Sequence, residues 1–332
     1  MNKLLLTFGL VLLCIVTLDA QQLPQFSQFH RNQSLFNPGA TGAYDFVDIT
    51  VGTRYQWLGI RNDNQGNVAP RTLYFNGTTT LGKNKEYYNP ALRVSSGPIK
   101  NPKVGTGRLK HALGGQVLAD EYGAFRQLSI AGTYAVHVPM SQEINLSLGI
   151  RGGIRNHSFL REKAQVLSSL VGGPADITYD NFIANGFNRT FIDIGSGLFL
   201  YSQRFFVGFS GYQLTQDFVS FGSGITDFNP VRHFDVSGGV ILPLNNDFTL
   251  MPAISLKLMS PSVAIGQLNI QTEYKEWLWF GLGYRHTESF SIMAGGNINQ
   301  RFKLGYSFDY VTSRINHFAA GGHELVLGFM LR

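Results

Sequence analysis

The sequence predicts an antiparallel transmembrane β-barrel of about fourteen strands in an outer membrane. Three observations predict it: apolar and polar side chains alternate along many short segments, the chain begins with an export signal, and its composition is unusual. Only 14% of its 332 residues are charged, beside 13% aromatic residues and 38 glycines, whereas an average soluble domain has about 25% charged residues. No apolar run of about 18 residues follows the signal, which excludes helical membrane spans. A large secreted β-sandwich or propeller is the soluble alternative.

Residues 1–20 have the pattern of a cleaved signal peptide. Lys3 precedes the apolar stretch 4–16, which is shorter than the roughly 20 residues that a membrane-spanning helix needs. We expect cleavage after Ala20. Cys14 is the only cysteine, so the mature chain has neither a disulfide nor a catalytic thiol. The alternative, a lipoprotein acylated at Cys14, expects a small residue where Leu13 stands.

Residues 21–45 lack the alternation of a strand and contain the turn signal Asn37-Pro38-Gly39. We expect this segment to fold into the barrel lumen as a plug or to lie across the periplasmic mouth. A flexible leader is the alternative.

Residues 46–332 form the predicted barrel. Along 301–310, Phe302, Leu304, Tyr306, Phe308 and Tyr310 alternate with Arg301, Lys303, Gly305, Ser307 and Asp309. A charge on the lipid-facing side at the membrane midplane destabilises a barrel by about 2 to 4 kcal/mol, which explains this separation. The predicted strands are 46–57, 71–82, 109–121, 125–138, 142–156, 190–203, 204–213, 231–243, 246–260, 263–275, 277–288, 289–299, 301–313 and 321–332. Their number is even, as closure of a bacterial single-chain barrel requires.

Loop lengths agree with both barrel ends being periplasmic, because bacterial barrels have short periplasmic turns and longer external loops. The long connections 157–189 and 214–230 are then external. The stretch 83–108 departs from this rule, since it is long and periplasmic. It is also basic, with six cationic residues against the single acid Glu86: Lys83, Lys85, Arg93, Lys100, Lys103 and Arg108. It either binds an acidic periplasmic partner or phosphate-bearing headgroups, or is a solvated insertion without a role.

Several motifs carry a family likeness. The segments QFSQFHRNQSLFNPGATGAYDF and GTRYQWLGI near the start, HALGGQVLADEYGAFRQ further on, and WFGLGYR, LGYSFDY and GGHE near the end together resemble the PorP/SprF family of type IX secretion system membrane proteins. The matching positions are Gln25, Phe26, Ser27, Gln28, Asn37, Pro38, Arg54, Gln56, Trp57, Tyr306, Asp309, His323 and Glu324. Phe308 and Gly322 stand where the family usually has Tyr and Ser, and 83–108 is longer than the common pattern.

The resemblance implies an outer-membrane component of the type IX secretion and gliding machinery of Bacteroidetes. Such a barrel supports export or surface anchoring of a secreted adhesin by protein–protein interaction. The implied partners are type IX components, such as the periplasmic ring or a peptidoglycan-linked lipoprotein, the adhesin itself and outer-membrane lipid. The alternative function is a passive porin or a fatty-acid-type outer-membrane transporter.

No set of residues in the sequence predicts catalysis, a metal or a cofactor. The pair His323-Glu324 lacks the second histidine of a helical zinc motif and falls on a strand, where neighbours point to opposite faces. Asp120 and Glu121 also point apart on a strand, and Gly208-Phe209-Ser210-Gly211 lacks the final glycine of a nucleophile elbow. Nucleic acid is a poor partner, because the positive charge is concentrated in one stretch of an exported chain.

Several polar residues fall on registers that face the predicted lumen: Arg54, Gln56, Lys257, Arg285, Lys303 and Asp309. We expect the opposite charges among them to pair across the lumen. A role in transport is the alternative.

Overall fold

The structure, a computed structural model, describes most of the chain beyond residue 23. The described residues are 24–43, 46–59, 61–62, 66–67, 69–81, 109–141, 143–164, 172, 177, 179–180, 188–215, 220–221, 231–259, 263–275, 277–298 and 301–331. The expected signal peptide 1–20 and the basic stretch 83–108 therefore lie outside the described residues. Among the residues just given, no helix has the length and apolar character needed to span a membrane.

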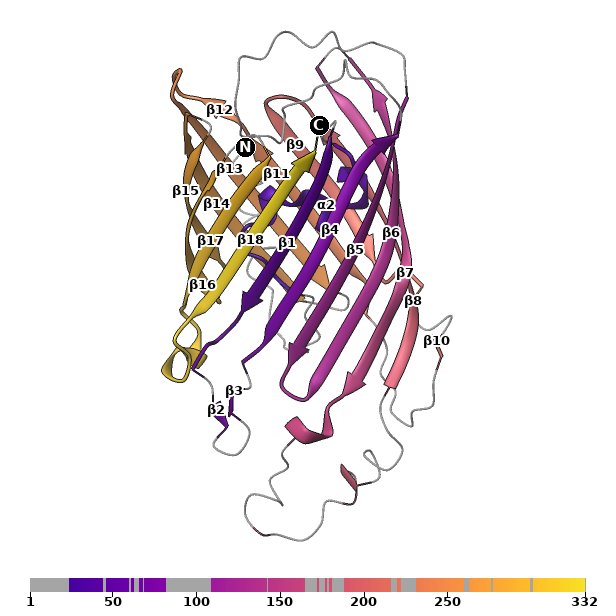
Figure 1. The fold of residues 1–332 in the computed structure, drawn as a ribbon, viewed down its shortest axis with the longest axis vertical. Coiled ribbons are helices and arrows are strands. Elements are labelled where there is room, and N and C mark those ends of the chain that lie inside the picture. Colours follow the sequence, from indigo (N-terminus) through magenta and orange to yellow (C-terminus); the bar gives the residue numbers. More distant parts are fainter. Residues whose placement is uncertain are drawn as a thin grey trace, which may run out of the picture.

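Fourteen long strands of the described chain form one closed antiparallel barrel (Figure 1). They are β1(Val47–Tyr55), β4(Arg71–Leu81), β5(Lys110–Tyr122), β6(Phe125–Pro139), β7(Asn145–Phe159), β8(Asn188–Tyr201), β9(Phe205–Tyr212), β11(His233–Val240), β13(Phe248–Met259), β14(Val263–Tyr274), β15(Leu278–Arg285), β16(Ser289–Asn297), β17(Phe302–Val311) and β18(Gly322–Leu331). Each pairs with the next along the chain, and β1 pairs with β18 to close the ring. The predicted barrel and its fourteen strands are confirmed.

Short elements accompany the barrel. β2(Arg61–Asn62) and β3(Gly66–Asn67) form a separate hairpin after β1. β10(Ser220–Phe221) pairs with β8, and β12(Leu242–Pro243) pairs with β13, so both extend the wall locally. The 3-10 turns η3(Arg161–Lys163) and η5(Arg314–His317) lie in the connections after β7 and β17.

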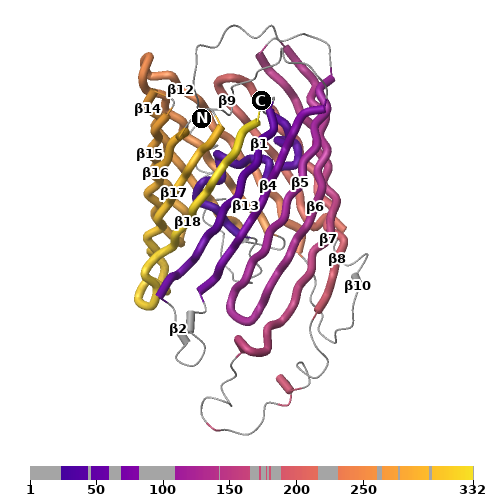
Figure 2. The backbone as a smooth tube through the Cα atoms, viewed as in Figure 1, coloured from indigo at the N-terminus to yellow at the C-terminus, as the bar shows by residue number. Residues whose placement is uncertain are grey.

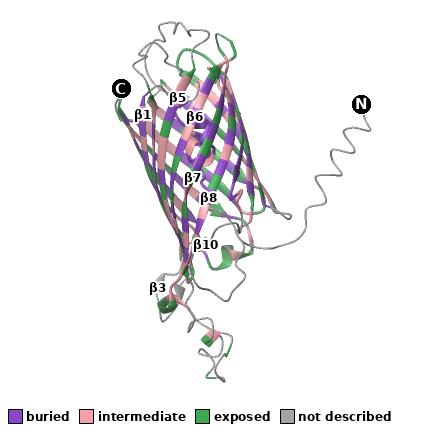
Figure 3. Ribbon diagram, turned by 90° about the vertical axis from the view of Figure 1, so that its right-hand side faces the viewer, coloured by how far each residue is buried: buried purple, intermediate pink, exposed green. Residues whose placement is uncertain are grey.

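The two faces of the wall differ in chemistry, as the alternation predicts. On β17, Tyr306 is 43% exposed on the outer face, whereas Asp309 is 2% exposed on the inner face. Figure 3 shows the same alternation of exposed and buried residues along the other strands. The outer face is apolar because it meets lipid, and the inner face collects polar residues that need partners inside the barrel.

Strand ends differ from the predicted ones by a few residues. The sequence predicts a first strand that includes Gln56 and Trp57, but β1 ends at Tyr55. Gln56 N–H donates to Pro70 O at 2.9 Å, and Trp57 turns the chain with a φ of +53°. At the other extreme β7 continues to Phe159, three residues past its expected end. The alternation fixes which residues face inward, but turn geometry decides where a strand stops.

An even number of antiparallel strands brings both barrel ends to the same side. The tight connections between β8 and β9, β14 and β15, and β16 and β17 lie on that side, together with the end of β18. The long connections after β7 and β9 lie on the opposite side. Loop length does not separate the two sides completely, because the short connections after β5 and β15 lie on the side of the long ones and the long connection after β4 lies on the other side.

Candidate functional site within the barrel

Residues 24–43, called the N-terminal segment below, lie inside the barrel. They form three single turns, η1(Phe29–Arg31), α2(Gln33–Phe36) and η2(Pro38–Ala40), visible as the indigo trace enclosed by the strands in Figure 2. The last turn contacts β6, β7, β8 and β9 from within. Helical turns this short are unstable alone in water. Their conformation therefore depends on the lumenal side chains around them.

Asn37 and Pro38 produce the turn that the sequence signals. The Asn37 side chain accepts from Gly39 N–H at 2.8 Å, and Pro38 begins η2, where a missing N–H has no cost. The amide of Asn37 also donates to Leu198 O on β8 at 2.9 Å. One side chain thus caps the turn and attaches it to the wall.

Two glycines of the wall leave the space that this turn occupies. A Cβ built on Gly149 of β7 would lie 2.2 Å from the Pro38 carbonyl, and one on Gly197 of β8 would lie 2.1 Å from Asn37 Oδ1. Neither distance is compatible with a side chain. The barrel is therefore shaped to accept backbone at this point.

Ser27 holds the other end of the segment against four buried charged residues. These are Arg54, Arg285, Asp309 and Glu324, which we call the charged cluster. Ser27 N–H donates to Glu324 at 2.7 Å, and Ser27 Oγ–H donates to Asp309 at 2.7 Å. Gln28 N–H donates to the second oxygen of Glu324 at 3.2 Å. The backbone of the segment thus supplies donors that a buried carboxylate requires.

Arg54 is at the centre of the charged cluster. Its guanidinium donates to Ser27 Oγ at 2.9 Å and to Glu324 at 3.1 Å, and it also contacts Asp309. Arg285 donates to Ser27 Oγ at 3.3 Å and lies 3.9 Å from Asp309. Two buried cations therefore face two buried carboxylates, and Ser27 is hydrogen-bonded to both signs. Arg285 also pairs at 3.1 Å with Glu288, which is partly exposed.

Further hydrogen bonds attach the middle and the end of the segment. His30 is paired through its two ring nitrogens with Gln271 at 2.8 Å and Asn269 at 3.0 Å, both on β14. Thr41 O accepts from His137 Nε2 at 2.8 Å. The anchor points lie on strands around the barrel, so the segment crosses the lumen instead of following one wall.

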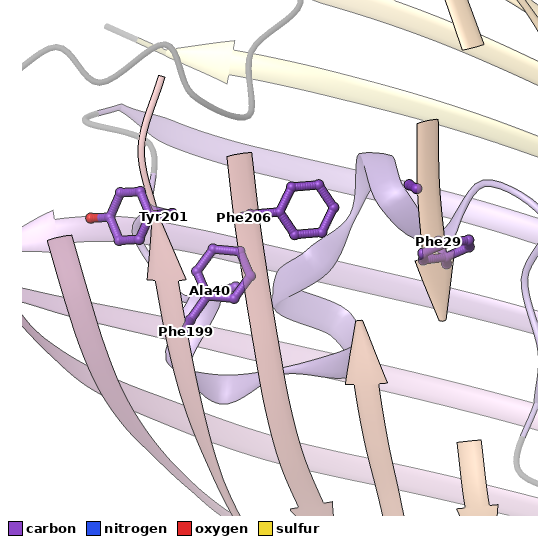
Figure 4. Close-up of a cluster of buried hydrophobic side chains, with 7 residues drawn as sticks. Phe29, Ala40, Phe199, Tyr201 and Phe206 are labelled. Carbon is purple, nitrogen blue, oxygen red and sulfur yellow. The ribbon is translucent and has the colours of Figure 1, made fainter. Parts of the chain in front are cut away.

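Apolar contacts complete the fit. Phe29, Ala40 and Ala43 of the segment pack with a group of inner-wall residues, shown in part in Figure 4: Phe199, Tyr201, Phe206 and Ala253. A second cluster joins Phe26 and Leu35 with Tyr74 and Val326, and the rings of Phe26 and Tyr74 meet edge to face at 4.8 Å. Burial of aromatic side chains on both sides makes the segment part of the protein core.

The amino-acid sequence of this barrel matches a profile described as type IX secretion system membrane protein PorP/SprF, over residues 18–329. The chain belongs to this family. The fold is that of an outer-membrane β-barrel, and the family is one of secretion-system membrane proteins. The predicted family is thereby confirmed.

Solved barrels of similar architecture share little sequence identity with this PorP/SprF protein. The toluene transporter TbuX of Ralstonia pickettii is 11% identical, with 90% of this chain and 92% of that chain covered and a TM-score of 0.47. The toluene transporter TodX of Pseudomonas putida is 11% identical, with 90% and 93% covered and a TM-score of 0.48. Omp33 of Acinetobacter baumannii is 8% identical, with 88% and 100% covered and a TM-score of 0.44. No curated protein matches the sequence.

The PorP/SprF motif positions divide into three groups in space. Those that meet in or beside the lumen are Gln25, Phe26, Ser27, Gln28, Asn37, Pro38, Arg54, Asp309 and Glu324. Tyr306 and His323 lie on the outer face, joined by a hydrogen bond of 2.7 Å between Tyr306 Oη and His323 Nδ1. Gln56 and Trp57 lie in the connection after β1. The motifs therefore describe one lumenal site, one outer-wall pair and one turn.

Charge pairing in the lumen follows the expectation for several residues and extends beyond it. Lys303 pairs with Asp48 at 2.8 Å, beside the pairs that Arg54 forms. Sequence reasoning missed a second group, in which Asp193 of β8 pairs with Arg155 at 2.7 Å and with Arg151 at 3.2 Å, both on β7. The sequence could have indicated this group, because all three charged residues occupy inward-facing positions of strands.

Replacing Gly149 with alanine is expected to displace the η2 turn. The added methyl group would overlap the Pro38 backbone, and such overpacking destabilises a protein by about 1 to 3 kcal/mol. Hydrogen exchange at the amides of Ala40 and Thr41, which close this turn, measures the effect and should become faster.

Gly152→Ala is the matched control, because a Cβ on Gly152 of the same strand meets open space. Equal exchange rates at Ala40 in the two variants would contradict the fit between the wall and the turn.

Proposed function

We propose that this PorP/SprF barrel supports export or surface anchoring of a secreted adhesin as a protein-binding component of the type IX secretion and gliding machinery. The observation that supports this most is the occupied lumen. The N-terminal segment fills it with hydrogen bonds, ion contacts and aromatic packing from residue 26 to residue 43. Such a barrel is suited to rigid protein–protein contact, whereas a passive porin or fatty-acid-type transporter requires a continuous path.

The same proposal includes an orientation in the outer membrane. Residues 1–20 are removed as a signal peptide, and the side with the tight turns and both barrel ends faces the periplasm. The basic stretch 83–108 connects β4 and β5 on that side. Its six cationic residues would meet the periplasmic ring or a peptidoglycan-linked lipoprotein. The long connections after β7 and β9 face outward, where an adhesin would be held.

Affinity capture of the tagged protein from native membranes, followed by mass spectrometry, tests this proposal. We expect type IX components and one large secreted adhesin to co-purify. A matched variant, with glutamine at Lys83, Lys85, Arg93, Lys100, Lys103 and Arg108, should lose the periplasmic component and keep the adhesin.

Deletion of the gene supplies the second readout. Display of one adhesin should disappear while general secretion continues. Loss of all secretion would instead indicate a core role, and capture of neither an adhesin nor any type IX component would reject the proposal.

A further inference from the structure

Two small cavities in the lumen meet at three residues beside the N-terminal segment. The first, of about 50 Å³, and the second, of about 30 Å³, share Phe36 of the segment, Tyr212 of β9 and Lys257 of β13. A water molecule needs about 10 to 15 Å³ of such space. Each cavity therefore has room for a few heavy atoms, and the three shared residues place the two cavities side by side.

Lys257 brings a cation to this junction. Its ammonium lies 4.6 Å from the centre of the Phe36 ring. Asp235 is its cross-strand neighbour, but Asp235 accepts from Ser255 at 3.3 Å. Within the described part of the chain, no carboxylate is within ion-pair distance of Lys257 and no acceptor is within hydrogen-bond distance. A lysine in this position can donate three hydrogen bonds to a ligand.

Tyr212 is a second donor without an acceptor. The residue is 6% exposed, and its hydroxyl has no hydrogen-bond partner among the described residues. Ser210, on the same strand face, donates instead to Phe36 O at 2.8 Å. A buried hydroxyl without a partner destabilises a protein by about 1 to 3 kcal/mol, so an acceptor from outside the chain would be stabilising.

Three cations and two acids lie around the cavities. The cations are Lys257, Arg151 and Arg155, and the facing acids are Asp193 and Asp235. The two arginines share Asp193, and Lys257 lies opposite Asp235 on the neighbouring strand. The rest of the first cavity is lined by the apolar residues Pro24, Phe26, Leu35, Phe36 and Leu118 and by the polar residues Gln116, Gln127 and Ser129.

We propose that this junction binds a carboxylate with a short apolar body. Lys257 and Tyr212 donate to its two oxygens, and Phe26, Leu35 and Phe36 contact its carbon chain. A carboxylate matches the donors that Lys257 and Tyr212 offer, and the apolar part of the lining favours an organic anion over an inorganic one. The carboxylate belongs either to a small free molecule or to the end of a peptide. This site rests on the lumen alone and does not depend on the proposed adhesin.

Binding of butanoate to the mature barrel in detergent solution tests the proposal. We expect saturable binding of ¹³C-labelled butanoate, observed by NMR, and none of butanol or butylammonium. Lys257→Met should weaken it about tenfold or more, and Tyr212→Phe should weaken it by a smaller factor of about three, since charge-assisted hydrogen bonds are the stronger ones. The matched control is Lys303→Met, which removes a lumenal lysine that is paired with Asp48 away from the cavities.

A pair of peptides distinguishes the two sources of the carboxylate. If a short peptide with a free C-terminal carboxylate binds and its C-terminal amide does not, a polypeptide end is the better ligand. If only butanoate binds, a small molecule is. Unchanged binding in Lys257→Met, equal binding of butanol, or full competition by chloride at the same ionic strength would each overturn the proposal. Tyr212→Phe preserves the test if the lysine variant fails to fold.

Discussion

Replacing Arg54 with methionine is expected to lower the free energy of unfolding of the barrel by about 3 to 5 kcal/mol and to release the N-terminal segment. Arg54 contacts Asp309, Glu324 and Ser27, all buried. Without its guanidinium, Asp309 and Glu324 would have only Arg285 nearby, which lies 3.9 Å from Asp309 and already pairs with Glu288 at 3.1 Å. Unfolding in denaturant, followed by tryptophan fluorescence of the detergent-solubilised protein, measures the loss.

Trypsin cleavage after Arg31 reports release of the segment separately from global stability. Arg31 belongs to η1 and stacks over Trp279 of β15 at 4.5 Å in the folded protein. It should therefore resist cleavage in the wild type and be cut in Arg54→Met. Arg71→Met is the matched control. Arg71 is 51% exposed in its ion pair with Glu121, and such a pair stabilises by about 0 to 1 kcal/mol.

A triple variant separates charge from packing. Asp309→Asn and Glu324→Gln, added to Arg54→Met, remove the carboxylates that the first substitution leaves uncompensated. Neutral replacement of a whole buried ionic group is often tolerated, so we expect stability to recover in large part. If Arg54→Met alone unfolds like the wild type and Arg31 stays uncut, the charged cluster does not hold the segment.

The barrel could be predicted from the sequence because lipid imposes a repeating rule on it. Each strand must place apolar residues outward, so Tyr306 and Asp309 could be assigned to opposite faces from their spacing alone. The ion pairs in the lumen could also be predicted in part, since an inward-facing arginine such as Arg54 needs an inward-facing carboxylate. Its contact with Asp309 crosses β18, and this depends on side-chain length that no repeat encodes.

The path of the N-terminal segment could not be predicted in this way. Its turns have no periodic pattern, and its position depends on individual fits, such as Pro38 against Gly149 and Ser27 against Glu324. Gly149 and Gly197 leave space for the segment, but this role can be recognised only once the path of the segment is known. The junction of cavities at Lys257 has the same origin, because it is the space that one particular packing leaves over.

Deleting residues 21–40 is expected to convert a closed barrel into a conducting one. Barrels of about eight strands are filled by their own side chains, whereas those of about sixteen strands leave an aqueous channel. Fourteen strands are close to the second case, so the lumen here is filled because the segment contributes Phe26, Phe29 and Leu35 to it. In planar bilayers we expect discrete current steps from the deletion variant and none from the wild type.

A point variant guards against the objection that the deletion simply damages the barrel. Ser27→Asp keeps the segment but adds a carboxylate to a cluster in which three acids, Asp309, Glu324 and Glu288, already outnumber the two arginines. Repulsion should detach this end and produce intermittent openings. Thr312→Asp, on an exposed connection after β17, adds the same charge away from the lumen and should produce no openings. The contrary result is an absence of current steps with both the deletion variant and Ser27→Asp, each folded normally. It would mean that the wall itself closes the pore and that the segment has another role.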